Sequence, residues 1–308
     1  MLDKKLSITS LIQSSDLSFD DTQTIFELTD FYIKNYKNGV KFDELKGVSI
    51  AMAFFEPSTR TKLSFDIAAK RLSADSISFQ SSSSSLTKGE SLIDTLKTIE
   101  AMGVHMYVVR HSKSGSPKFL QENTNGSILN AGDGKHAHPT QALLDSYTLR
   151  QHFGSLKNLK VCICGDILHS RVARSNIELL KILGADVRLC GPGTLLPRHI
   201  NIWNCQFCED VNDAIKWADV LLVLRLQRER MENGILPSIR EFNKYFGVSI
   251  DQFKKKKDLV IMHPGPVNYG VELDYNISFE KNCLIETQVT HGVFIRMALL
   301  ALLGQRFK

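Results

Sequence analysis

Hydroxyl and guanidinium side chains gather in one short stretch, Ser58 to Thr61. The apolar run at 48–54 is typical of a buried strand, and Leu63 and Ile67 recur afterwards at helical spacing. The start of a helix presents unpaired N–H groups and a partial positive charge, so it attracts anions. Hydroxyls and a guanidinium there add directed donors for phosphate oxygens. The stretch predicts a phosphate site, with helix capping as the simpler interpretation of its hydroxyls.

Other cationic residues follow predicted strands. Arg110 and Arg225 each end an apolar run. Arg171 begins a predicted helix that follows the apolar run at 160–164. Open α/β sheets bind ligands at the carboxyl ends of their strands. Because arginine grips a carboxylate with two parallel hydrogen bonds, Arg171 and Arg225 suit a ligand with two carboxylates. The sequence therefore places arginines suited to anionic ligands at the carboxyl ends of predicted strands.

Lys88 follows five consecutive serines, Ser81 to Ser85. By composition this stretch is a flexible linker. However, an amphipathic helix with Leu92 and Leu96 on its apolar face comes directly after it. A loop with one lysine also suits a phosphate lid, since lysine carries a point charge on a long stem.

His138 and Gln141 stand one turn apart at the start of a predicted long helix, with Pro139 well placed in its first turn. The helix dipole disfavours the cationic imidazole there, so we expect His138 to be neutral. A neutral imidazole can still donate one hydrogen bond to a carbonyl oxygen. On chemistry alone, a histidine at this position caps the helix about as often as it serves catalysis.

The elements that must position these residues alternate between strand and helix. Strands are expected at 48–54, 76–79, 105–109, 127–130, 160–164, 186–190, 220–224 and 259–262. Such alternation predicts an α/β protein with parallel sheets flanked by helices, and 308 residues fit two domains. We expect a first domain at 1–137, a connecting helix at 138–152 and a second domain at 153–289.

Composition excludes several classes of protein. With 43% hydrophobic residues and no apolar run near the roughly 20 residues of a membrane span, we expect no membrane segment. The start lacks a signal-peptide core, and six cysteines without framework spacing indicate a cytoplasmic protein with reduced thiols. Cys205 to Cys208 form a CxxC, but no second pair with zinc spacing follows it, so we expect no metal site. The net charge of +5 suits anionic substrates, so the lysines at 254–257 are interpreted as a solvated edge and not a nucleic-acid site.

Ser58-Thr59-Arg60-Thr61 resembles the carbamoyl-phosphate signature of the transcarbamoylases. Four further stretches of this chain also resemble that family: His138-Pro139-Thr140-Gln141, Gly165 to Arg171, Arg225-Leu226-Gln227 and His263-Pro264-Gly265-Pro266. Together these motifs span nearly the whole chain. They are most similar to the branch of the family whose acceptor is aspartate.

The resemblance implies transfer of the carbamoyl group from carbamoyl phosphate to the amine of L-aspartate, a step of pyrimidine biosynthesis, without a cofactor or metal. It implies carbamoyl-phosphate contacts from Ser58, Thr59, Arg60, Thr61, Arg110, His138, Gln141, Gly265 and Pro266. It implies aspartate contacts from Lys88, Arg171, Arg225 and Gln227. The residues expected to act in catalysis are Arg60, Thr61, Lys88, Arg110 and His138.

The resemblance also implies a homotrimer in which the serine loop reaches a neighbouring subunit's active site. Lys88 and either Ser84 or Ser85 would touch the substrate there. The last helix, about residues 290–308, would fold back onto the first domain. Whether a regulatory or dihydroorotase partner chain binds stays open.

Two alternatives remain. An ornithine carbamoyltransferase shares the first half, but its ornithine site carries His-Cys-Leu-Pro where this chain has His263 to Pro266. A cationic amino acid also fits poorly beside Arg171 and Arg225. The second alternative is a carbamoyl-phosphate-binding subunit without catalysis, and the presence of every motif residue argues against it.

Overall fold

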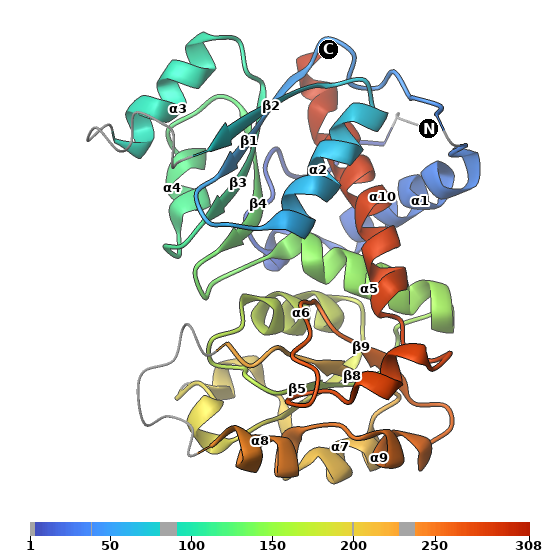
Figure 1. Ribbon diagram of the computed structural model, residues 1–308. Coiled ribbons are helices and arrows are strands. Elements are labelled where there is room, and N and C mark those ends of the chain that lie inside the picture. Colours follow the sequence, from blue (N-terminus) through green and yellow to red (C-terminus); the bar gives the residue numbers. More distant parts are fainter. Residues whose placement is uncertain (1–3, 38, 81–90, 199, 228–237) are drawn as a thin grey trace. The chain divides into compact units, whose positions relative to one another are not determined.

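The computed structural model describes residues 4–37, 39–80, 91–198, 200–227 and 238–308. The chain divides into two compact units, Met1–Leu143 with Thr290–Lys308, and Leu144–Val289. Each unit is built on a parallel sheet flanked by helices, which confirms the predicted fold class (Figure 1).

The sheet of the first unit has the strand order β2-β1-β3-β4, and all its pairs are parallel. Its strands are β1 (Ser49–Phe54), β2 (Asp75–Gln80), β3 (Met106–His111) and β4 (Ser127–Asp133). Its helices include η1 (Ser14–Asp16), α1 (Phe19–Asn35), α2 (Thr59–Arg71), α3 (Leu92–Ala101) and α4 (Ser116–Gln121). In this order β2 lies on one side of β1 and β3 lies on the other, so the sheet winds in both directions from β1.

The helix α10 (Ile285–Gly304), with η8 (Gln305–Phe307) after it, ends the chain. From Thr290 onward it belongs to the first unit, as the sequence led us to expect. The Phe294 ring packs edge-on against Tyr36 at 5.7 Å between ring centroids, and Gly304 lies against Leu45 and Met106. Figure 1 shows α10 running beside α2 and α1. The helix is long and apolar enough to cross a membrane, but 72% of its apolar window is buried, so it is a core helix.

The sheet of the second unit has the strand order β7-β6-β5-β8-β9, again with parallel pairs. Its strands are β5 (Lys160–Cys164), β6 (Asp186–Cys190), β7 (Gln206–Cys208), β8 (Val220–Val223) and β9 (Val260–Met262). Its helices include α6 (Arg171–Ile182), η4 (Gly193–Leu195), η5 (Ile200–Trp203), α7 (Val211–Trp217), α8 (Ile239–Phe246), α9 (Ile250–Lys254) and η7 (Tyr275–Phe279). The helix α5 (Pro139–Phe153) enters this unit at Leu144.

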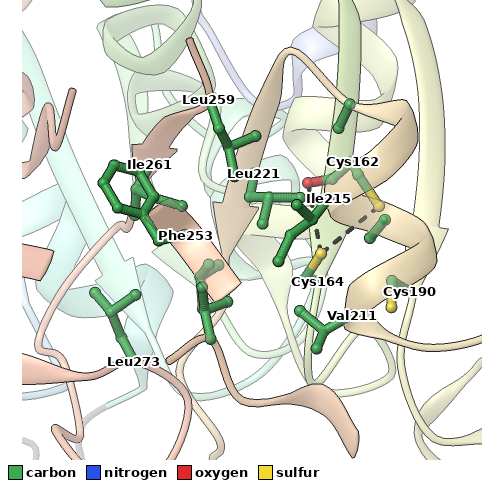
Figure 2. Packing of buried hydrophobic residues seen from close by; sticks show 14 of the residues in the cluster. Cys162, Cys164, Cys190, Val211, Ile215, Leu221, Phe253, Leu259, Ile261 and Leu273 are labelled. Carbon is green, nitrogen blue, oxygen red and sulfur yellow. Dashed lines mark hydrogen bonds between the residues drawn. The ribbon is translucent and has the colours of Figure 1, made fainter. Parts of the chain in front are cut away.

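Four cysteines pack in the core of this second unit, and Figure 2 labels three of them, Cys162, Cys164 and Cys190. The Cys162 sulfur lies 3.6 Å from that of Cys164 and 4.0 Å from that of Cys208. All three thiols and Cys190 are free and buried among aliphatic side chains. Cys162 and Cys164 thus serve core packing.

Candidate active site

Both sheets reverse their winding direction at one point. In the first sheet the reversal lies between β1 and β3, and in the second it lies between β5 and β8. Connections leave these neighbouring strands in opposite directions, which opens a crevice at their carboxyl ends where ligands bind. The loops after β1, β5 and β8 carry predicted site residues, and Arg110 lies near the carboxyl end of β3 itself.

Ser58 is the residue before α2, and the loop from β1 leads directly to it. Its hydroxyl makes no capping hydrogen bond within the described residues, whereas the hydroxyls of Ser18 and Ser170 cap their helices. The first turn of α2 also holds no acidic side chain. Thr61 is buried in that turn, and Arg60 is exposed. The Ser58 hydroxyl is therefore not used for capping within the described residues, which favours an anion site at the start of α2 over the simple capping interpretation.

Arg110 lies beside this loop. It pairs in register with Phe54, the last residue of β1, and its carbonyl accepts a hydrogen bond from the Phe55 N–H at 2.8 Å. Its Nη1 donates to the Ala131 carbonyl at 3.2 Å, and its Nη2 lies 3.4 Å from the Glu56 carboxylate. The guanidinium is thus fixed at the ends of β1, β3 and β4.

Asp133 ends β4 and shapes the turn that leads to His138. Its carboxylate accepts hydrogen bonds from the N–H groups of Gly115 at 2.7 Å and Ala137 at 3.0 Å. Burial raises the pKa of Asp133, but hydrogen bonds from His136 and other groups outweigh burial, so the pKa is lowered from 3.8. An ionised anchor of this kind holds the turn rigidly.

His138 lies directly before α5 and is buried, with 4% of its surface exposed. Its Nδ1 is 3.5 Å from the Thr140 hydroxyl, and its carbonyl accepts from the Gln141 N–H at 3.0 Å. Gln141 is buried one turn into the helix. The position at a helix start agrees with the predicted one.

In the second unit, Arg171 is the first residue of α6 and is buried, while Arg225 and Gln227 follow β8. Asp166 joins the two loops. Its Oδ2 accepts from the Gln227 N–H at 3.3 Å, and its Oδ1 lies 2.9 Å from His169 Nδ1. Burial raises the pKa of Asp166, although the His169 charge and hydrogen bonds oppose this effect. The structure therefore ties the Arg225 segment to the loop that ends at Arg171.

Close packing explains Gly165 in this loop. Its φ is +119°, and a Cβ there would lie 3.0 Å from the Leu224 carbonyl oxygen. Any larger residue would push apart the loops after β5 and β8. In the sequence Gly165 and Asp166 are visible only as part of a motif, because their positioning contacts depend on the order of the strands in the sheet.

The turn from His263 to Pro266 follows β9. Gly265 has a φ of +63° and donates its N–H to His263 Nδ1 at 2.8 Å, and the Gly265–Pro266 peptide bond is cis. Pro266 is exposed. The backbone conformation at Gly265 favours glycine, which accounts for the residue found there.

The predicted residues fall into two groups, one in each unit. The first unit holds Ser58, Thr59, Arg60, Thr61, Arg110, His138 and Gln141. The second unit holds Arg171, Arg225, Gln227, Gly265 and Pro266. Lys88, Ser84 and Ser85 lie outside the described residues.

Comparison with known proteins agrees with this arrangement. Residues 9–151 match the aspartate/ornithine carbamoyltransferase carbamoyl-P binding domain, and residues 157–303 match the Asp/Orn binding domain of the same family. The aspartate carbamoyltransferase catalytic subunit of Halothermothrix orenii is 52% identical over 86% of this chain and 85% of its own length. The subunit of the same name from Flavobacterium psychrophilum is 45% identical over 99% of this chain and 100% of its own.

Solved structures give the same result. Aspartate transcarbamoylase from Trypanosoma cruzi, in complex with N-(phosphonacetyl)-L-aspartic acid, superposes with a TM-score of 0.87 and 27% identity over 95% of each chain. The catalytic subunit of M. jannaschii aspartate transcarbamoylase gives a TM-score of 0.84 and 31% identity, covering 96% of this chain and 98% of its own. The resemblance seen in the motifs is confirmed: this chain belongs to the aspartate/ornithine carbamoyltransferase family.

Proposed function

We propose that this enzyme transfers the carbamoyl group of carbamoyl phosphate to L-aspartate, giving N-carbamoyl-L-aspartate and phosphate. The observation that carries the proposal is the placement of basic residues at the reversal points of both sheets. Arg60 and Arg110 lie at the first, and Arg171 and Arg225 lie at the second. Two anionic substrates require such cationic positions, because each must give up part of its hydration on binding.

Carbamoyl phosphate is assigned to the first unit. The N–H groups at the start of α2, with Ser58, Thr59 and Arg60, bind the phosphate oxygens. Thr61, Arg110 and His138 donate to the carbamoyl oxygen, which gains negative charge in the tetrahedral intermediate. Gln141 binds the amide end of the substrate. The contacts of Arg110 with Ala131 and Glu56 support this role, since a fixed donor needs little reorganisation during the reaction.

Aspartate is assigned to the second unit, where Arg171 and Arg225 bind its carboxylates and Gln227 assists. The backbone carbonyls at Gly265 and Pro266 accept hydrogen bonds from the substrate amines. The neutral aspartate amine attacks the carbamoyl carbon, a C–N bond forms, and the C–O bond to phosphate breaks. The departing phosphate takes the amine proton, so the protein contributes mainly positioning. The names of the relatives at 45–52% identity favour aspartate over ornithine as the acceptor.

A cytoplasmic homotrimer with shared active sites completes the proposal. Leu63 and Ile67 are 54% and 41% exposed one turn apart on α2, and Ile77 is 48% exposed on the edge strand β2. The Ser76 hydroxyl donates to Asp66 at 2.6 Å, so the helix and the strand adjoin. An exposed apolar surface beside an anion site supports contact with a second copy of this chain at that place. Lys88 would enter the neighbour's site from there.

The test compares acceptors. Purified protein with carbamoyl phosphate should release phosphate and N-carbamoyl-L-aspartate in equal amounts when aspartate is supplied, and should leave ornithine unreacted. Faster turnover of ornithine than of aspartate would overturn the choice of acceptor. Carbamoyl-phosphate binding by calorimetry without turnover of either amino acid would favour the non-catalytic alternative.

A further inference from the structure

Glu272 is a buried carboxylate that the roles assigned so far do not use. Neither its side chain nor that of His263 has any exposed surface, and their Oε1 and Nε2 atoms lie 3.4 Å apart. A carboxylate is rarely buried to this extent unless it is paired or hydrogen-bonded. Its neighbours are therefore informative.

The first neighbour is the imidazole of His263. The Gly265 N–H donates to its Nδ1 at 2.8 Å, so Nδ1 carries no proton. The proton of the neutral ring is then on Nε2, which lies 3.4 Å from Glu272 Oε1 in a contact that falls short of hydrogen-bond geometry. A carboxylate at that position favours this tautomer and orients the ring, as carboxylates do for histidines in many active sites. Glu272 thereby supports the bond that shapes the turn at Gly265.

The second neighbour is Asn268, whose N–H donates to the same Oε1 atom at 2.6 Å. The Asn268 side chain donates in turn to the Leu226 carbonyl at 3.4 Å. Leu226 lies between Arg225 and Gln227 in the chain. One carboxylate oxygen is thus connected both to the turn after β9 and to the segment after β8.

The other end of the turn has its own anchor. The His263 N–H donates to Gln288 Oε1 at 3.0 Å, and Gln288 Nε2 donates to Asp145 at 2.7 Å. These bonds fix the start of the turn, whereas Glu272 Oε1 accepts from the Asn268 N–H at its far end.

We propose that Glu272 is a positioning residue for the acceptor step. It fixes the backbone from His263 to Asn268 and, through Asn268 and Leu226, the segment that carries Arg225 and Gln227. Glu272 does not touch a substrate itself. This inference rests on the proposed function, which places aspartate and the substrate amines at those two segments.

The experiment uses the full-length enzyme and three variants, Glu272→Ala, Glu272→Gln and the control Glu280→Gln. Glu280 is a partly exposed carboxylate of the same unit, with Lys254 at 3.7 Å, and it has no part in the proposed site. Displacing catalytic groups by about an ångström costs up to about a hundredfold. We therefore expect Glu272→Ala to raise the KM for aspartate about tenfold and to lower kcat, with inhibition by inorganic phosphate unchanged within about twofold.

Glu272→Gln should restore most of the loss. Both contacts use Oε1, and Oε2 makes no hydrogen bond within the described residues, so one amide oxygen can replace the carboxylate there. Selective ¹⁵N labelling of histidine should show His263 protonated at Nε2 and not at Nδ1 in the wild-type enzyme. The control Glu280→Gln should match the wild type in both kinetic constants.

A purely structural role predicts a different result, since a smaller folded fraction lowers kcat per total enzyme and leaves KM unchanged. An unchanged KM for aspartate in folded Glu272→Ala would overturn the proposal, as would a doubly protonated His263. If Glu272→Ala does not fold, Glu272→Asp withdraws the oxygen by one methylene and gives the same test. If the wild type used ornithine instead, the proposed function would fail, and the same variants measured with ornithine would still test Glu272.

Discussion

The guanidinium of Arg110 and the carboxylate of Glu56 lie 3.4 Å apart, and both side chains are largely buried. This contact joins the carboxyl end of β3 to the loop that leads from β1 to α2. A second bond, to the Ala131 carbonyl at 3.2 Å, comes from the other terminal nitrogen of the same guanidinium. Only a planar fork can reach both partners and still present donors to a ligand.

Replacing Arg110 by lysine keeps the positive charge but removes the planar guanidinium, so it tests the geometry of the donors and not the charge. We expect Arg110→Lys to lower kcat about a hundredfold, the usual cost of losing one donor to a developing oxyanion, with a smaller change in the KM for carbamoyl phosphate. Steady-state kinetics measures both constants. Lys118→Ala, which removes an exposed cation paired with Glu122 on the surface, is the control and should behave as the wild type. A kcat within threefold of the wild-type value would place the carbamoyl oxygen elsewhere.

Asp133 gives a prediction on stability. Asp133→Asn removes the charge that accepts from Gly115 and Ala137, so we expect it to cost about 1–3 kcal/mol in the free energy of unfolding. Chemical denaturation of the variant and the wild type at neutral pH measures this difference. An unchanged free energy of unfolding would mean that the turn before His138 is held by other contacts.

The pH dependence has a defined sign. The folded-state pKa of Asp133 is lowered from 3.8, so its contribution is fully present above that value and is lost as the pH falls through the folded pKa. The wild type should therefore lose more stability than Asp133→Asn in that acidic range. Thermal unfolding at successive pH values below 3.8 compares the two. Parallel curves would contradict the assignment of this acid sensitivity to Asp133.

Arg225 separates the two substrates. Arg225→Ala should leave carbamoyl-phosphate binding intact and abolish the binding of succinate, a dicarboxylate, to the loaded enzyme, because a bidentate carboxylate partner is lost. Calorimetric titration of succinate into the complex with carbamoyl phosphate checks this expectation. Equal succinate affinity in the variant and the wild type would move Arg225 out of the acceptor site.

Much of the fold could be predicted from local sequence. Each predicted strand has a counterpart in the structure, because buried parallel strands are short apolar runs bounded by turns. The edge strand β7, Gln206–Cys208, was missed: it has three residues, and two of them are exposed, so it carries no such signal.

The site was predictable where a motif is local. The stretch Ser58 to Thr61 begins α2 as expected, and Arg171 begins α6. The roles of Asp133 and Glu272 could not be foreseen, because their partners are chosen by the packing of several segments and not by spacing along the chain. The same holds for His136, which belongs to none of the predicted motifs: it is partly exposed, and its Nδ1 lies 3.0 Å from the Asp133 carboxylate.

The shared site can be tested by mixing two inactive variants, Lys88→Ala and Arg225→Ala, and reassembling them from unfolded chains. In a ring of three, an intact site arises where an Arg225→Ala chain lends its loop to the cleft of a Lys88→Ala chain. Random assortment of equal amounts should then restore roughly a quarter of all sites. If Lys88 serves its own chain, mixing restores nothing. Mixed trimers confirmed by mass, with activity no higher than that of the separate variants, would rule out the shared site.

The proposed reaction depends most on the phosphate site at the start of α2, so Arg60→Ala is its most direct test. Arg60 is exposed in the first turn of that helix, and a charge-assisted bond to phosphate is worth about 1.5–3 kcal/mol. Lys70→Ala, which removes an exposed cation from the last turn of the same helix, is the matched control. We predict that kcat/KM for carbamoyl phosphate falls at least about tenfold in Arg60→Ala and stays unchanged in Lys70→Ala. Kinetics of Arg60→Ala within twofold of the wild type would contradict the phosphate site and the reaction built on it.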